Sequence, residues 1–145
     1  MKIICIGQNY LEHIKELSNV KSKEPLVFLK PDTALIPKDR SFFIPNFSNE
    51  IHYELEVVIK IKKPGRYIER KYSSQYYDEI TLGIDFTARD LQKKLREKGH
   101  PWEKSKSFDG STLVGNFLNK NELPPISNLN FHLLKNDNIV QSENT

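Results

Sequence analysis

The stretch of residues 51–60 constrains the fold of this chain more than any other. Apolar or aromatic residues stand at every second position, and the positions between them include two glutamates, Glu54 and Glu56. Successive side chains of a β-strand point to opposite faces, so the alternation predicts a half-buried strand with both glutamates on one face. Two carboxylates at that spacing are about 6–7 Å apart.

Two carboxylates this close have two interpretations. Like charges repel unless a cation lies between them or one is protonated, and hard divalent ions such as Mg²⁺ take oxygen ligands of this kind. The alternative is a solvated strand face with two unrelated glutamates, because antiparallel sheets commonly expose one polar face. The strand alone leaves both interpretations open, and a third ligand has to decide between them.

The composition excludes several classes of protein. The 145 residues suit one domain, and 22 basic against 19 acidic residues are too balanced to indicate a nucleic-acid partner. The basic segment 60–71 contains Pro64-Gly65 and predicts an exposed loop. Cys5 is the single cysteine, which excludes an internal disulfide and favours a reducing compartment. We find no signal segment and no long apolar run, so we expect a cytoplasmic protein that does not span a membrane.

The pattern of the sequence predicts a mixed α/β fold that is mainly β. Thr87 with Asp90 three residues later predicts a capped helix start, residues 102–110 predict a loop, and Asn136-Asp137-Asn138 predicts a hairpin turn. The first strand is expected to be buried. Strands are predicted at 1–6, 26–29, 51–60, 80–85, 111–118, 129–134 and 139–142, and helices at 9–17 and 88–98.

Two further groups of residues can carry chemistry. His13 and Glu16 are three apart on the predicted helix 9–17, where the carboxylate can orient the ring as a general base, although a surface ion pair is the alternative. Asp85 ends a predicted strand, and Arg89 and Gln92 follow at the start of a helix. A helix N-terminus, an arginine and an acid together suit an anionic ligand bridged by a metal.

Five stretches, in this order, give the chain its resemblance to a known family. It resembles the fumarylacetoacetate hydrolase family, closest to its acylpyruvate hydrolase and oxaloacetate decarboxylase-like members. The stretches are Cys5-Ile6-Gly7-Gln8-Asn9-Tyr10, Phe28-Leu29-Lys30-Pro31, His52-Tyr53-Glu54-Leu55-Glu56, Asp85-Phe86-Thr87-Ala88-Arg89-Asp90-Leu91-Gln92, and Pro101-Trp102 with Lys106-Ser107-Phe108-Asp109.

The resemblance implies a role for each candidate residue. Glu54, Glu56 and Asp85 match the family's ligands for Mg²⁺ or Mn²⁺. His13 and Glu16 match the pair on a lid helix that activates a water. Lys106 matches the lysine that faces the substrate carbonyl, and the implied substrate-binding residues are Arg89, Gln92 and Lys30.

The implied activity is metal-dependent cleavage of a carbon–carbon bond in a small acylpyruvate-type β-diketo acid, through an enolate held by the metal. Decarboxylation of oxaloacetate would use the same enolate. The alternatives are an isomerase or tautomerase of a 2-hydroxy-diene-dioate in aromatic catabolism, and a catalytically silent binding domain. The resemblance also implies a homodimer.

The implied fold is a β-roll with a few peripheral helices. Residues 1–49 would form an N-terminal strand and lid region, and residues 50–145 the metal-bearing core of a single domain. Thr145 follows one arm of a predicted hairpin, and the family continues with a Thr-Gly-Thr-Pro-containing segment that this sequence does not contain. We therefore expect the chain to be a fragment of a longer protein.

Overall fold

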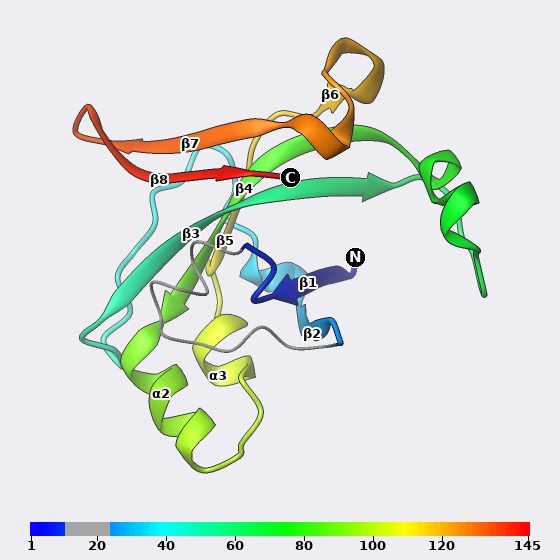
Figure 1. The fold of residues 1–145 in the computed structure, drawn as a ribbon. Coiled ribbons are helices and arrows are strands. Elements are labelled where there is room, and N and C mark those ends of the chain that lie inside the picture. The colour runs from blue at the N-terminus through cyan, green and yellow to red at the C-terminus, as the bar shows by residue number, and fades with distance from the viewer. Residues whose placement is uncertain (11–23) are drawn as a thin grey trace. The chain divides into compact units, whose positions relative to one another are not determined.

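The computed structural model describes residues 1–10 and 24–145 (Figure 1). The predicted helix at 9–17 falls largely on the remaining residues, so His13 and Glu16 lie outside the described residues. Within the described ranges, no helix has the length and apolar character needed to cross a membrane.

Strands dominate the described part of the chain, which confirms the prediction of a mixed and mainly β fold. Residues 1–10 and 24–145 contain two α-helices, α2 (Arg89–Glu97) and α3 (Glu103–Lys106), with short 3-10 helices at Asp32–Ala34, Arg70–Tyr76, Lys120–Glu122 and Ile126–Asn128. The strands are β1 (Ile3–Gly7), β2 (Leu26–Lys30), β3 (Ile51–Ile61), β4 (Tyr77–Ala88), β5 (Thr112–Val114), β6 (Leu118–Asn119), β7 (Asn130–Lys135) and β8 (Asn138–Asn144).

The chain divides into two compact units. The first unit comprises Met1–Glu54 and Ile84–Leu113, and the second comprises Leu55–Gly83 and Val114–Thr145. The long strands β3 and β4 supply residues to both units and belong to one sheet with the order β3-β4-β5, in which β6 also pairs with β4. The expected division of a single domain near residue 49 stays a prediction.

In the first unit, β1 and β2 pair antiparallel as a two-stranded sheet. Ile4 lies opposite Leu29 and Ile6 opposite Val27, and these four aliphatic side chains are exposed, Ile4 to 63%. The prediction of a buried first strand was therefore wrong. An apolar run predicts burial on both faces, but here one face of the small sheet is open.

The start of α2 is fixed by residues 48–50. The Arg89 amide donates to the Glu50 carbonyl across 2.8 Å, and the Ser48 hydroxyl donates to an Asp90 carboxylate oxygen across 2.5 Å. The predicted helix is confirmed, but the predicted Thr87 cap is wrong, because Thr87 is still part of β4 and is fully buried. The cap position is Ala88, which makes no side-chain hydrogen bond, and Asp90 is instead bound by Ser48.

The predicted loop at 102–110 contains a single helical turn, α3. The Trp102 carbonyl accepts hydrogen bonds from the amides of Ser105 and Lys106, across 2.8 and 3.1 Å, and another from the Ser105 hydroxyl. A helix of four residues is too short to show a hydrophobic period, so the sequence pattern did not reveal it. α3 packs against α2 and β2 (Figure 1).

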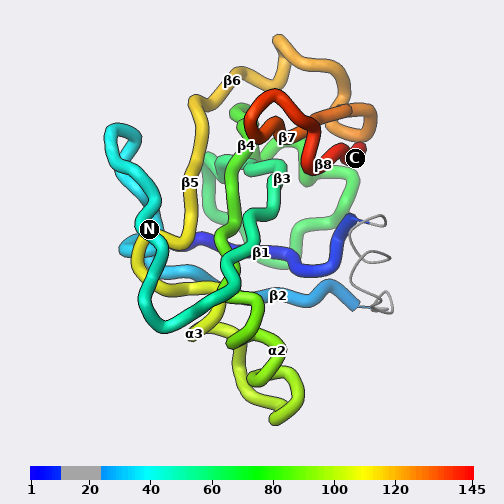
Figure 2. Tube along the Cα trace, turned by 90° about the vertical axis from the view of Figure 1, so that its left-hand side faces the viewer, coloured from blue at the N-terminus to red at the C-terminus, as the bar shows by residue number. Residues whose placement is uncertain are grey.

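In the second unit, β7 and β8 run side by side as a hairpin (Figure 2). The predicted turn is confirmed, since Asn136 and Asp137 both have positive φ, 50° and 64°, as a tight hairpin turn requires. The predicted strand at 111–118 is instead two short strands, β5 and β6. The whole basic segment 60–71 is exposed, as predicted, but only residues 62–69 lie between regular elements. Lys60 belongs to β3, and Lys71 belongs to the 3-10 helix Arg70–Tyr76.

Candidate functional site

Two carboxylates are buried in the first unit. Glu54 comes from β3 and Asp85 from β4, and each side chain is 10% exposed. The interpretation of the β3 glutamates as a solvated face is therefore wrong for Glu54. A buried carboxylate is costly unless a partner neutralises it, so the groups around these two define what the site can do.

Lys106 bridges the two carboxylates. As the last residue of α3 it brings its ammonium to 2.7 Å from Oε2 of Glu54 and 2.8 Å from Oδ2 of Asp85. Its side chain is 4% exposed, and its Nζ lies 5.5 Å from the centre of the Phe28 ring. Two oxygens from different strands therefore converge on one positive centre.

Lys30, at the end of β2, binds the other oxygen of Asp85. Its ammonium lies 2.7 Å from Oδ1 of Asp85, 2.9 Å from the Ser111 carbonyl and 3.2 Å from the Ser111 hydroxyl. An ammonium has three N–H donors, and these three acceptors account for all of them. Lys30 thus holds Asp85 in place, and the Ser111 hydroxyl in turn donates to the Lys106 carbonyl across 2.9 Å.

The two buried lysines have opposite pKa shifts. Burial lowers the pKa of Lys30, and the attraction of Asp85 offsets only part of that effect. Burial also acts to lower the pKa of Lys106, but the charges and hydrogen bonds of Asp85 and Glu54 together outweigh it and raise the pKa. The difference follows from the number of carboxylates, one beside Lys30 and two beside Lys106.

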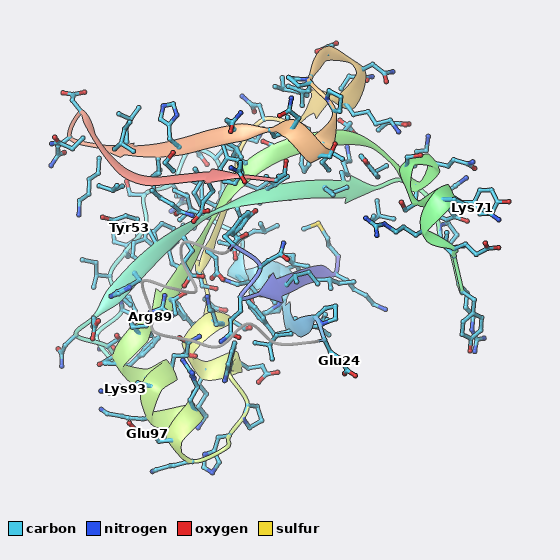
Figure 3. All side chains as sticks on the ribbon, viewed as in Figure 1. Glu24, Tyr53, Lys71, Arg89, Lys93 and Glu97 are labelled. Atoms are coloured by element: carbon cyan, nitrogen blue, oxygen red, sulfur yellow. The ribbon has the colours of Figure 1, made fainter. Side chains whose placement is uncertain are left out.

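Arg89 completes the set of charges. As the first residue of α2, its guanidinium donates to Oε1 of Glu54 through Nη2 and to Oε1 of Gln92 through Nη1, the latter across 2.5 Å. Figure 3 shows Arg89 at the end of α2 that joins β4, while the exposed Lys93 and Glu97 lie further along the helix. Gln92 is buried one turn from Arg89 and orients it.

The first unit thus brings together six of the nine predicted site residues. Glu56 is on β3, is half-buried and belongs to the second unit. His13 and Glu16 lie outside the described residues. The six are Lys30, Glu54, Asp85, Arg89, Gln92 and Lys106.

Sequence reasoning missed three polar residues that contact this group, Ser111, His52 and Thr87. The Thr87 hydroxyl, predicted only as a helix cap, donates to Oε1 of Glu54 across 3.5 Å. Ser111 binds Lys30, and the Nε of Arg89 donates to Nδ1 of His52 across 3.3 Å. No local signal marks Ser111, which is 81 residues away from Lys30 in the chain. His52 carried a signal, since it stands two residues before Glu54 on the same strand face.

The carboxylate oxygens of this cluster are of the chemical type that binds hard divalent cations. Glu54 and Asp85 offer carboxylate oxygens that already meet at one positive centre, as ligands of Mg²⁺ or Mn²⁺ must. In the ranges that the structure describes, no three His, Cys, Asp or Glu side chains are gathered for a metal. Glu54, Glu56 and Asp85 as a complete ligand set stay a prediction.

Among the residues that the structure describes, three cationic groups face two carboxylates in this cluster. The positive excess favours an anionic ligand, and guanidinium and ammonium groups are the usual protein partners of carboxylate and enolate oxygens. Low exposure strengthens each of these interactions relative to water. The arrangement can therefore hold a small acid and stabilise negative charge that develops on its oxygens.

Comparison with known proteins gives relatives whose names refer to oxaloacetate. The chain is 34% identical over 143 residues to the mitochondrial oxaloacetate tautomerase of Bos taurus, covering 99% of this chain and 65% of that protein. It is 36% identical over 145 residues to the mitochondrial oxaloacetate decarboxylase of Dictyostelium discoideum, covering 99% and 66%. The chain thus spans about two thirds of the length of these relatives.

A solved structure extends the similarity to the fold. The fumarylpyruvate hydrolase of Pseudomonas aeruginosa, in complex with Mn²⁺ and pyruvate, superimposes with a TM-score of 0.90 at 29% identity, covering 99% of this chain and 64% of that one. The family described as fumarylacetoacetate (FAA) hydrolase C-terminal matches residues 2–145. The buried site and these matches agree: the chain belongs to the fumarylacetoacetate hydrolase family.

Proposed function

We propose that this chain carries the metal- and substrate-binding part of an enzyme that acts on a small 2-oxo acid through its enolate. The observation that carries the proposal is the convergence of Glu54 and Asp85 on the Lys106 ammonium inside a buried, positively charged cluster. Such a cluster can neutralise an acid substrate and the additional charge of its enolate. The names of the relatives support the same class of substrate.

In this proposal Glu54, Glu56 and Asp85 hold Mg²⁺ or Mn²⁺. When bound, the ion supplies Lewis-acid polarisation of the keto oxygen. Lys30 fixes the Asp85 carboxylate, so that one of its oxygens stays directed at the centre of the cluster. Lys106 offers its ammonium to the developing oxyanion, and Arg89 offers a guanidinium to the substrate carboxylate.

Tautomerisation or decarboxylation of an oxaloacetate-like acid is the activity we favour for the whole protein. The relatives at 34% and 36% identity carry these two activities in their names. Both reactions need an enolate, but neither needs an attacking water. The cluster of the first unit suffices for their charge stabilisation.

Hydrolysis of an acylpyruvate is the second candidate. The fold similarity to a fumarylpyruvate hydrolase supports it. Here His13, oriented by Glu16, would remove a proton from the water that attacks the distal carbonyl. The two candidates are separated by His13→Ala, which should abolish hydrolysis and leave tautomerisation of oxaloacetate intact.

Homodimerisation and a cytoplasmic location stay predictions.

The first experiment tests binding. We expect Mn²⁺ with oxalate, a mimic of the pyruvate enolate, to raise the unfolding free energy of the 145-residue chain by about 2.7 kcal/mol at 100 times the dissociation constant. Glu54→Gln should abolish the shift because it removes one carboxylate of the cluster. Thermal unfolding with each ligand alone and with both gives the measurement, followed by the decay of oxaloacetate enol absorbance and the release of pyruvate.

Glu79→Gln is the matched control, because Glu79 pairs with Lys60 on the exposed surface of the second unit. It should leave the ligand-induced shift unchanged. A shift of equal size in Glu54→Gln would refute the metal site, and a folded chain without any shift would favour the silent binding domain.

A further inference from the structure

The guanidinium of Arg89 is held at three nitrogens. Glu54 and Gln92 accept from its two terminal nitrogens, and Nδ1 of His52 lies 3.3 Å from its Nε. His52 comes from β3 and Gln92 from α2, so the group is fixed from two elements of the first unit. The terminal nitrogens carry four N–H donors, and two of these have no partner among the described residues.

The hydrogen-bond chemistry determines which nitrogen of His52 carries the proton. Arginine stays protonated and its Nε–H can only donate, so Nδ1 of His52 must accept. Nε2 of His52 then carries the ring proton, and it lies 2.9 Å from Oε1 of Glu50. The three groups therefore form a directed chain in which Arg89 donates to His52 and His52 donates to Glu50.

Glu50 anchors this chain a second time. Its carbonyl accepts the backbone amide of Arg89 across 2.8 Å, so the same residue fixes both the backbone of Arg89 and, through His52, its side chain. The Glu50 and His52 side chains are partly exposed, whereas the Arg89 side chain is 14% exposed. The outer pair thus supports a more buried cation from the solvent side.

We propose that His52, oriented by Glu50, is a positioning residue that aims the free N–H donors of Arg89 at an anionic ligand. The inference rests on the proposed function, because Arg89 is the group that would meet the substrate carboxylate. Without His52, Glu54 and Gln92 still hold the terminal nitrogens, but the guanidinium can rotate about them. Orientation of a donor that is otherwise free contributes to ligand affinity rather than to metal affinity.

The test compares two substitutions in the 145-residue chain. His52→Leu keeps the approximate size of the side chain and removes the acceptor, whereas His52→Asn places an amide oxygen near the position of Nδ1. We expect His52→Leu to weaken oxalate binding to the Mn²⁺-loaded chain by about tenfold, the effect of losing one charge-assisted hydrogen bond. Mn²⁺ affinity should stay within about twofold, because no ligand oxygen has been removed.

Calorimetry gives the oxalate affinity, and the electron paramagnetic resonance signal of free Mn²⁺ gives the metal affinity. His52→Asn should restore most of the oxalate affinity. Equal losses of oxalate and Mn²⁺ affinity in His52→Leu would show a merely structural role and overturn the proposal. Unchanged oxalate affinity would overturn it as well.

A readout that is independent of ligand binding separates this inference from the proposed function. Nitrogen-15 NMR of the unliganded chain should show an unprotonated Nδ1 and a protonated Nε2 in His52, and an Arg89 Nε–H that exchanges slowly with water. That exchange should become faster in His52→Leu and stay slow in His52→Asn. A proton on Nδ1 would overturn the positioning chain, even if the wild-type chain binds Mn²⁺ and oxalate. With the NMR result as expected and no binding by the wild type, the proposed function alone would fail.

Discussion

The buried ion cluster of the first unit and the exposed Lys60–Glu79 pair of the second unit have nearly the same N–O distances. Lys106 lies 2.7 and 2.8 Å from its two carboxylates, and Lys60 lies 2.6 Å from Glu79. Their surroundings differ, because Lys106 is 4% exposed whereas Lys60 and Glu79 are 54% and 41% exposed. Every buried charged residue of the described chain is in the first unit, so burial and not distance distinguishes the candidate site.

The physical consequence is a difference in what each lysine stabilises. An exposed pair exchanges two hydrated ions for a contact that is screened by salt, and the net gain is small. A buried pair has already lost its water, so removing one partner leaves an uncompensated charge. The same contact distance therefore has different energies in the two units.

The largest expected effect comes from Lys106→Met. This change leaves Glu54 and Asp85 without their shared partner and should lower the unfolding free energy by about 3–5 kcal/mol. Lys60→Met, the matched change in the second unit, should cost less than about 1 kcal/mol. Urea denaturation at low and high salt measures both, and only the Lys60 effect should decrease with salt. Similar losses in the two variants would contradict the comparison.

Lys30→Met should have an intermediate effect and a distinct dependence on pH. It leaves buried acceptors on Asp85 and Ser111 unsatisfied and should cost about 1–3 kcal/mol. Because burial lowers the folded-state pKa of Lys30 below the ordinary 10.5, the folded protein binds fewer protons in that interval, and its stability rises with pH there. The difference between wild type and Lys30→Met should therefore grow as pH rises towards 10.5.

For Lys106 the stability changes with pH in the opposite direction, so Lys106→Met serves as the control. The pKa of Lys106 is raised, so its contribution is complete below 10.5 and is lost only as the pH rises through the higher folded-state value. Denaturation of the three proteins over an alkaline pH series separates the two lysines. If the unfolding free energies of Lys30→Met and Lys106→Met changed with pH in parallel, the two lysines would have similar surroundings and the prediction would be wrong.

The smallest expected effect comes from Ser48→Ala. The Ser48 hydroxyl holds the pKa of Asp90 below its ordinary 3.8, so this carboxyl stabilises the fold above 3.8 and loses that contribution as pH falls through its lowered pKa. Because Asp90 is partly exposed, the loss at neutral pH should be no more than about 1 kcal/mol and should shrink in acid. Denaturation at neutral and acidic pH checks this, with Ser73→Ala as a control without a carboxylate partner. A loss that stays constant with pH would contradict it.

The sequence predicted the parts of the site that local patterns encode. Glu54 could be identified because a strand repeats every two residues, and Asp85 because it stands near the start of a helix. The resemblance then supplied Lys106 and Lys30. Ser111 could not be found, because it acts through a contact with Lys30 between residues far apart in the chain.

Two errors show where local patterns fail. Thr87 looked like a helix cap, but the sheet continues through it and buries it, so tertiary packing decided its role. Glu54 looked as though it could face solvent, because alternation separates two strand faces without telling whether the polar face is covered. Lys106 and Arg89 cover Glu54 in the structure.

The open face of β1 and β2 has a consequence for work with the isolated chain. Ile4, Ile6, Val27 and Leu29 form two cross-strand pairs of aliphatic side chains in contact with solvent. Contiguous apolar surface of this kind adsorbs to hydrophobic resins, takes up fluorescent dyes such as anilinonaphthalene sulfonate, and promotes precipitation by ammonium sulfate. This face can therefore give a dye signal in the folded chain, so that such a signal is by itself no sign of unfolding.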